Sequence, residues 1–117
     1  MNEDDILEIR DPWTMPYLEY ERIFIKALRR QIGRSHLLFG RDVQVLALRR
    51  DPDAVIYETV DEPLLYVLVY HSWSEPAVPR RGKSLKPVLL AGREAVRRQI
   101  DKDHAEWKAQ FNQVSKA

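Results

Sequence analysis

The stretch Pro63–Trp73, PLLYVLVYHSW, is the longest apolar run in the chain. Successive side chains of a strand point to opposite faces of a sheet, and here both sets are apolar almost to the end of the stretch. A strand that is apolar on both faces is typical of the interior of a fold. We therefore predict a central strand, with functional candidates at its exit, where the run changes to Tyr70-His71-Ser72-Trp73.

The composition favours one soluble domain. A chain of 117 residues with a hydrophobic fraction of 44% can bury a single core. There is no cysteine, which excludes disulfide bonds and thiolate metal sites and fits a reducing compartment. The acidic N-terminus lacks a secretory signal, and no apolar run approaches the roughly 20 residues that span a bilayer. We expect a cytoplasmic protein without a membrane partner.

The net charge of +1 conceals a banded arrangement of charges. Residues 1–24 hold seven acids against two bases, and residues 26–50 hold seven bases against one acid. Residues 51–62 carry acids only, and residues 80–86 carry bases only. Such bands steer charged partners. The alternative is that opposite bands face each other within the fold or are simply solvated.

In the first part of the chain we predict a flexible or loosely docked arm over residues 1–13, followed by a helix over residues 14–32. Thr14 is a suitable N-cap, Pro16 is tolerated in a first turn, and Gly33 is a suitable residue to follow the last turn. Helical spacing connects a set of apolar residues, which we expect to form the buried face. The set is Tyr17, Tyr20, Ile23, Phe24, Ile25, Ala27 and Leu28.

Three strands are predicted within residues 43–73. Val43–Arg50 and Ala54–Val60 read as strands, because β-branched and aromatic residues are frequent and Asp51-Pro52-Asp53 between them favours a turn. The opening stretch is the third. Short turns imply an antiparallel meander, in which the second strand is central and the apolar outer edge of the third needs a cover. Helices, a fourth strand or another subunit would provide it.

In the last part of the chain we predict a loop over residues 74–87 and a helix over residues 88–111. Ser84 can cap this helix, and Pro87 can occupy its first turn. An apolar stripe of helical period follows: Leu89, Val96, Ile100, Trp107 and Phe111. We thus expect a single α+β domain over 1–117, with an N-terminal helix, a three- or four-stranded antiparallel sheet and a long C-terminal helix packed on the sheet.

No catalytic, metal or cofactor motif is recognisable. His36, His71 and His104 are far apart and fit no metal-ligand spacing, so we predict no metal site. Ser72 directly follows His71, and neighbours in a strand point to opposite faces, so these two side chains cannot face each other. No GxSxG, GxGxxG or phosphate-loop motif occurs, and no cofactor is expected. Either His71 and His104 are hydrogen-bonded packing residues, or they belong to a site. The candidates for ligand or interaction contacts are Tyr70, His71, Trp73, His104 and Trp107.

Anion binding is predicted for the basic part of the loop. The candidates are Arg80, Arg81, Lys83 and Lys86, with Arg29, Arg30 and Arg34 as possible helpers. Trp73 lies near this loop, and single-stranded nucleic acids bind to basic surfaces with stacking aromatics. The pI of about 8.0 and the acidic bands argue against a nucleic-acid partner.

The layout resembles a group of small standalone bacterial α+β proteins of unknown function. The resemblance covers roughly residues 15–110 and rests on three motifs: H-x-L-[FY]-G at His36–Gly40, [ST]-W-S at Ser72–Ser74, and D-H-x-x-W at Asp103–Trp107. It implies a fold but no activity. In size and layout the chain also resembles toxin-immunity proteins.

Three functions remain open. Because no catalytic constellation is present, we expect a non-enzymatic protein-interaction module, with immunity as one version and another protein or a second copy as partner. The alternative is a small enzyme or ligand binder with a pocket at the end of the third strand. Nucleic-acid binding through the basic loop is the third.

Overall fold

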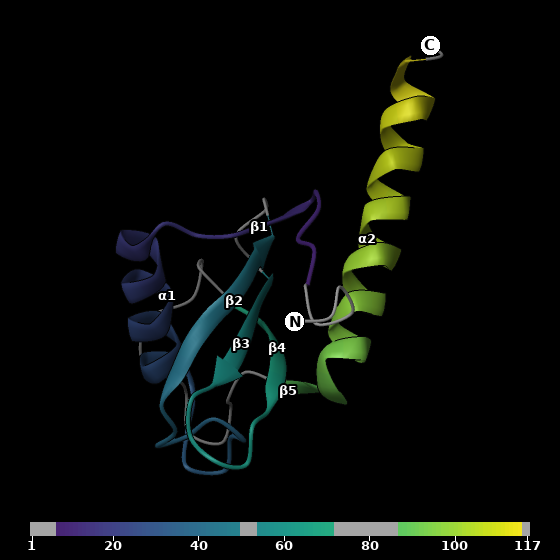
Figure 1. The fold of residues 1–117 in the computed structure, drawn as a ribbon. Coiled ribbons are helices and arrows are strands. Elements are labelled where there is room, and N and C mark those ends of the chain that lie inside the picture. Colours follow the sequence, from purple (N-terminus) through teal and green to yellow (C-terminus); the bar gives the residue numbers. More distant parts are fainter. Residues whose placement is uncertain (1–6, 50–53, 72–86, 116–117) are drawn as a thin grey trace.

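The computed structural model of the protein describes residues 7–49, 54–71 and 87–115. Their elements form an antiparallel sheet in the order β1-β2-β3-β4-β5 and two helices (Figure 1). The predicted α+β fold is confirmed: it has an N-terminal helix, an antiparallel sheet and a long C-terminal helix packed on the sheet. The sheet has five strands rather than three or four. In chain order the elements are β1 Trp13–Thr14, α1 Leu18–Gln31, β2 Val43–Arg49, β3 Ala54–Thr59, β4 Tyr66–Tyr70, β5 Pro87–Leu90 and α2 Gly92–Ser115.

The apolar stretch in the middle of the sequence supplies β4, an interior strand. It pairs with β3 on one side and with β5 on the other. Val67, Leu68 and Val69 are all at most 2% exposed. The outer edge that needed a cover is therefore paired with a further strand. The two faces of β4 are apolar because Val67 and Val69 lie in one hydrophobic layer and Tyr66 and Leu68 in the other.

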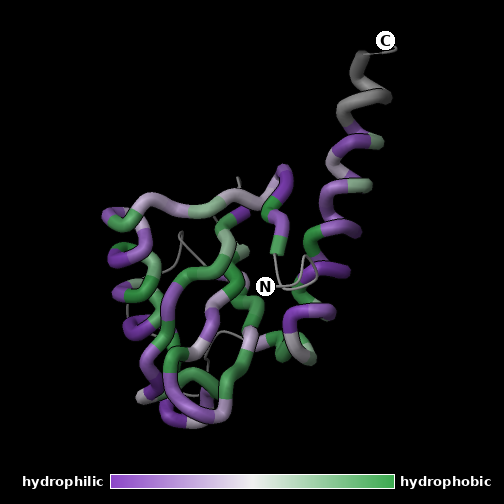
Figure 2. Tube along the Cα trace, in the orientation of Figure 1, coloured by the Kyte–Doolittle hydropathy of each residue, from purple (hydrophilic) through white to green (hydrophobic). Residues whose placement is uncertain are grey.

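The sheet separates two hydrophobic layers. Figure 1 shows α1 on one side of the sheet and α2 on the other. Figure 2 shows largely hydrophobic strands, whereas hydrophobic and hydrophilic residues alternate around the turns of α1. The layer under α1 contains Phe24, Leu28, Ile32, Leu38, Val45, Val55, Tyr57, Val67 and Val69. The layer under α2 contains Trp13, Ala47, Ala54, Ile56, Tyr66, Leu68, Leu90, Val96 and Ile100.

The first helix begins later than the sequence indicated. Thr14 is not its N-cap but the second residue of β1, opposite Leu48 of β2. Met15 precedes Pro16, and a residue before proline is restricted to extended conformations, which delays the helix. Tyr17 occupies the N-cap position without a side-chain hydrogen bond.

The second helix also begins later than predicted. Residues 88–90 belong to β5, and Pro87 lies in this edge strand, opposite Val69, rather than in a helical turn. Proline is tolerated there because an edge strand has one unpaired side. Gly92 has a φ of +83°, a left-handed conformation that favours glycine, and it starts α2. Ser84, the predicted cap, lies outside the described residues.

The segment 7–13 is not a free arm. Its Arg10 pairs with Asp101 of α2, and the ring N–H of Trp13 donates to Oδ2 of Asp103 at 2.8 Å. Leu7 and Ile9 pack against the hydrophobic layer under α2. In Figure 1 this segment runs from beside α2 into β1 at the upper rim of the sheet, and the last turns of α2 project beyond it. Within the described ranges, neither helix has the length and apolar character needed to cross a bilayer.

Candidate functional site

His71 lies directly after β4, in the buried layer under α1. Its Nε2 lies 2.6 Å from the hydroxyl oxygen of Tyr57, and its Nδ1 lies 2.9 Å from Oε1 of Gln31. The Tyr57 hydroxyl also lies 3.0 Å from the carbonyl oxygen of Phe24. This polar network therefore ties two strands to the inner face of α1.

The network determines what His71 can do chemically. Burial lowers the pKa of His71 to about 4 and raises that of Tyr57, so both side chains are neutral at pH 7. Nδ1–H then donates to Gln31, and Nε2 accepts from the Tyr57 hydroxyl, which shares its proton with the Phe24 carbonyl. Both ring nitrogens are engaged, so we interpret His71 as a hydrogen-bonded packing residue.

His104 lies on the other side of the sheet, on α2. Its Nδ1–H donates to the carbonyl oxygen of Asp11 at 2.7 Å. Its ring stacks on that of Trp107, with 6.0 Å between the centroids and 24° between the planes. These contacts attach the segment before β1 to α2.

The predicted candidates do not converge. His71 belongs to the layer under α1 and His104 to the side of α2, so the sheet lies between them. Tyr70 is 47% exposed, and the guanidinium of Arg49 lies 5.7 Å from its ring centroid. Among the described candidates, His104 and Trp107 are in ring contact, and Tyr70 and His71 are consecutive in the chain. Trp73 and the whole basic set of Arg80, Arg81, Lys83 and Lys86 lie outside the described residues.

His36 is buried in the loop between α1 and β2. The backbone N–H of Leu38 donates to its Nδ1 at 3.0 Å, which places the proton on Nε2. That atom is buried and has no hydrogen-bond partner in the part of the chain that the structure describes. Burial lowers the pKa of His36, so the ring is neutral and serves to shape the loop. Within the described ranges, no group of three or more His, Asp or Glu side chains could hold a metal ion.

A row of exposed apolar side chains occupies the start of α1. Five of them are between 53% and 80% exposed. Tyr17, Tyr20 and Ile23 follow one another at spacings of three, which places them in a line along the helix surface. The rings of Tyr17 and Tyr20 are 6.4 Å apart. We call this surface the α1 patch, which consists of Met15, Tyr17, Leu18, Tyr20 and Ile23.

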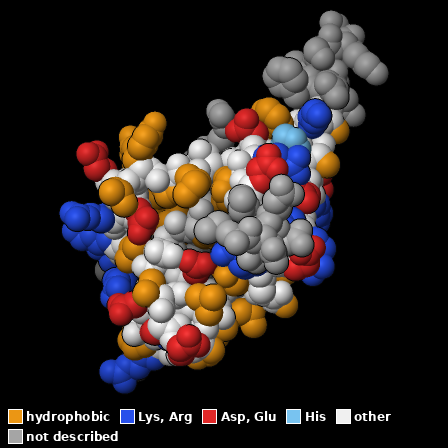
Figure 3. Space-filling view, viewed as in Figure 1, with side chains coloured by type: hydrophobic (Ala, Val, Ile, Leu, Met, Phe, Trp, Pro, Cys, Tyr) orange, Lys and Arg blue, Asp and Glu red, His pale blue; other side chains and the backbone are white. Residues whose placement is uncertain are grey.

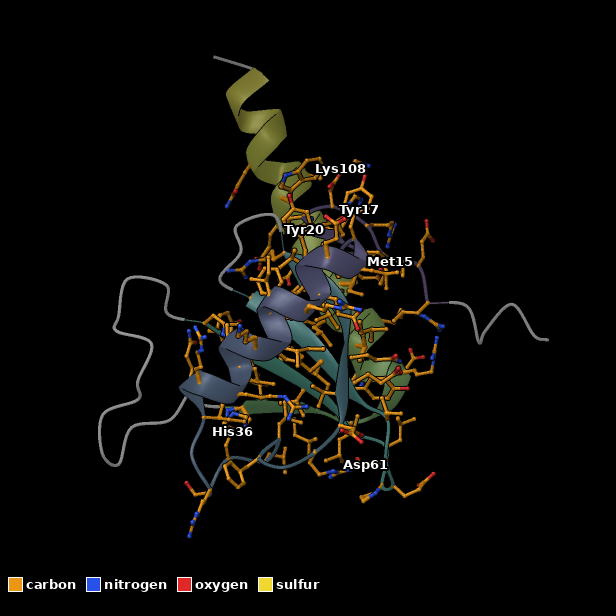
Figure 4. All side chains as sticks on the ribbon, turned by 90° about the vertical axis from the view of Figure 1, so that its left-hand side faces the viewer. Met15, Tyr17, Tyr20, His36, Asp61 and Lys108 are labelled. Carbon is orange, nitrogen blue, oxygen red and sulfur yellow. The ribbon has the colours of Figure 1, made fainter. Side chains whose placement is uncertain are left out.

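The figures place the α1 patch at one end of the molecule. Hydrophobic side chains stand out at the upper left of Figure 3, over the start of α1. Met15, Tyr17 and Tyr20 are labelled at the same end in Figure 4, opposite the end that carries His36 and Asp61. Met15 also lines a shallow hollow of about 480 Å³ beside His104. An exposed apolar surface thus continues into a concave one.

Helical spacing had predicted Tyr17 and Tyr20 on the buried face of the helix. Of that predicted set, the structure buries Phe24 and Leu28, whereas Tyr20 and Ile23 are exposed on the flank of the buried face. A signal was present in the sequence, since the apolar residues of this helix cover too wide an arc for contact with one sheet. Two of them are tyrosines, which are frequent at interfaces.

The fold and surfaces define a class: a small α+β protein with an antiparallel sheet between two helices and an exposed apolar row on the first helix. Comparison of the chain with protein-family models, with curated proteins and with solved structures finds no match.

Proposed function

We propose that the protein is a non-enzymatic module that binds another protein through the α1 patch, and that immunity to a toxin is one concrete form of this function. The observation that carries the proposal is the exposed row of Tyr17, Tyr20 and Ile23 with Met15 and Leu18 beside it. The sequence led us to expect an interaction module without indicating which surface binds, and the proposal assigns the binding to the α1 patch.

The composition of the patch supports a protein partner. Soluble proteins scatter single exposed apolar side chains, whereas a contiguous group marks a contact surface. Tyrosine contributes much contact area at little entropic cost, and tyrosines are enriched among the residues that dominate binding energy. The hollow beside Met15 offers space for a side chain of the partner.

The charges around the patch support a partner with a basic rim. Glu19 and Glu21 lie in the first turn of α1 beside the tyrosines. Complementary charges at a rim raise the association rate more than the affinity. The absence of cysteine supports a reducing location such as the cytoplasm.

The test is differential capture from the native cell with a tagged protein. The variant Tyr17→Ala/Tyr20→Ala truncates two exposed side chains of the patch, and Leu64→Ala truncates one that is 51% exposed outside it. We expect a partner that the wild type and Leu64→Ala retain and that the double variant loses. Circular dichroism should show unchanged folding of all three proteins.

Two outcomes contradict the proposal. One is a partner that all three proteins capture equally, because binding would then use another surface. The other is a stable dimer that the double variant abolishes, since the patch would then serve self-association rather than a different protein. Light scattering after size-exclusion chromatography distinguishes a dimer from a monomer.

A further inference from the structure

A second concave site lies at the opposite end of α1 from the α1 patch. This pocket has a volume of about 210 Å³. Its floor is apolar and well buried, formed by Leu28, Ile32 and Leu38. A cavity of about 150 Å³ is large enough for benzene. The pocket therefore has room for one aromatic ring and a small polar group. The complete lining is Leu28, Arg29, Ile32, Leu38, Phe39, Gly40, Arg41 and Val43.

Two arginines line this pocket, and they differ in their ion pairing. Arg41 is held by Asp61, with Nε donating to Oδ1 at 2.7 Å, and its Nη2 also donates to the carbonyl oxygen of Pro63 at 2.6 Å. This pair fixes the loop wall and compensates the charge of Arg41. Arg29 is exposed and has no ion pair or hydrogen bond with a side chain among the described residues. Its guanidinium is the available cation at the rim.

The charge around the pocket is positive, although the pocket lies at the C-terminal end of α1, where the helix dipole is negative. A helix C-terminus contributes about half a negative charge. The charged side chains that line the pocket, or pair with its lining, more than offset it: they are Arg29 and Arg41 against Asp61. Figure 4 shows His36 and Asp61 at this end of the molecule, away from the labelled Met15, Tyr17 and Tyr20.

We propose that this pocket binds a small aromatic carboxylate, with the ring against the accessible side chains of Phe39 and Val43 and the carboxylate on Arg29. Guanidinium groups match the planar geometry of a carboxylate and can donate two parallel hydrogen bonds. Phe39, which is 49% exposed, provides an aromatic edge at the rim. This site goes beyond the proposed protein-binding function and uses none of the α1 patch.

The test is a titration of the whole protein with benzoate, followed by the backbone amide signals of Phe39 and Gly40 in NMR spectra. A ligand of this size in an open pocket is expected to bind in the millimolar range. Benzyl alcohol tests the ring without the charge, and acetate tests the charge without the ring. Arg29→Gln removes the available cation. Arg22→Gln, about two turns earlier on the same helix and also exposed, is the matched control.

We expect saturable benzoate binding that Arg29→Gln weakens about tenfold or more and that Arg22→Gln leaves unchanged. Benzyl alcohol and acetate should each bind more weakly than benzoate. The proposal is overturned if benzoate produces no saturable shift at Gly40, if Arg29→Gln binds benzoate like the wild type, or if benzyl alcohol binds equally well. None of these outcomes affects the protein-binding function, which is tested by capture.

Discussion

The hydroxyl oxygen of Tyr57 lies 2.6 Å from Nε2 of His71, in the buried layer between the sheet and α1. The same hydroxyl lies 3.0 Å from the carbonyl oxygen of Phe24. One phenol group thus connects β3, the residue after β4, and the middle of α1. Polar groups in such a layer are costly when they lose a partner, so this network fixes the position of the helix on the sheet.

Removal of this hydroxyl should destabilise the fold. Tyr57→Phe keeps the ring but removes the hydroxyl that Nε2 of His71 and the Phe24 carbonyl both contact, at a cost of about 1–3 kcal/mol in the free energy of unfolding. Tyr70→Phe makes the same chemical change at a side chain that is 47% exposed and should cost less than about 0.5 kcal/mol. Urea unfolding measures both. Equal costs for the two variants would show that the buried network contributes nothing.

Stability should also fall in mild acid because of His71. Its pKa is lowered from 6.5 to about 4 by burial in the folded state. Between these values the unfolded state binds more protons, so the free energy of unfolding decreases as pH falls from about 6.5 towards 4. The expected slope is up to about 1.4 kcal/mol per pH unit. Burial shifts the pKa of His36 in the same direction, so it adds to the effect.

The variant His71→Gln separates the two histidines. It cannot titrate in this range, so its free energy of unfolding should depend less on pH between 4 and 6.5 than that of the wild type. The residual slope then belongs to His36 and the carboxylates. Urea unfolding at four or more pH values checks this, and parallel curves for the two proteins would rule out the assignment to His71.

The sequence predicted those elements whose residues carry a repeating pattern. The buried Phe24 and Leu28 identify α1, and the run around Val67–Val69 identifies β4 as an interior strand. The positions of two strands were not predicted, although a fourth strand was one of the expected covers for the outer edge of β4. β1 has two residues, too few for any alternation. Pro87 fits both the first turn of a helix and an edge strand, and only its pairing with β4 decides between them.

The candidate site was harder to predict than the fold because it depends on which face each side chain reaches. His71 and His104 are both near apolar residues in the sequence, but the sheet separates them. Tyr17 and Tyr20 have the spacing of a buried face and nevertheless lie beyond the contact with the sheet. Sequence spacing gives the angle of a residue around a helix and does not give the width of the surface that the sheet covers.

Two glycines provide a matched test of backbone conformation. Neither Gly92 nor Gly33 has an atom within 4 Å of the position of an added Cβ. Only Gly92 has a positive φ, of +83°. Gly92→Ala should therefore cost about 1–2 kcal/mol in the free energy of unfolding, whereas Gly33→Ala should be neutral or stabilise by up to about 1 kcal/mol. Thermal unfolding compares the two, and a neutral Gly92→Ala would contradict the left-handed conformation at the start of α2.

The attachment of the N-terminal segment to α2 should depend more on Trp13 than on Arg10. Trp13 is 1% exposed, and its ring N–H donates to Asp103. Trp13→Phe removes this donor and part of the buried ring, and should cost about 2–4 kcal/mol. The side chains of Arg10 and Asp101 are 39% and 50% exposed, and exposed ion pairs contribute about 0–1 kcal/mol, which is the expected cost of Arg10→Gln.

Urea unfolding followed by far-ultraviolet circular dichroism gives both costs without relying on tryptophan emission. Hydrogen exchange should show faster exchange in β1 for Trp13→Phe only. A larger loss from Arg10→Gln would mean that the ion pair, rather than the buried ring, holds the segment on the helix.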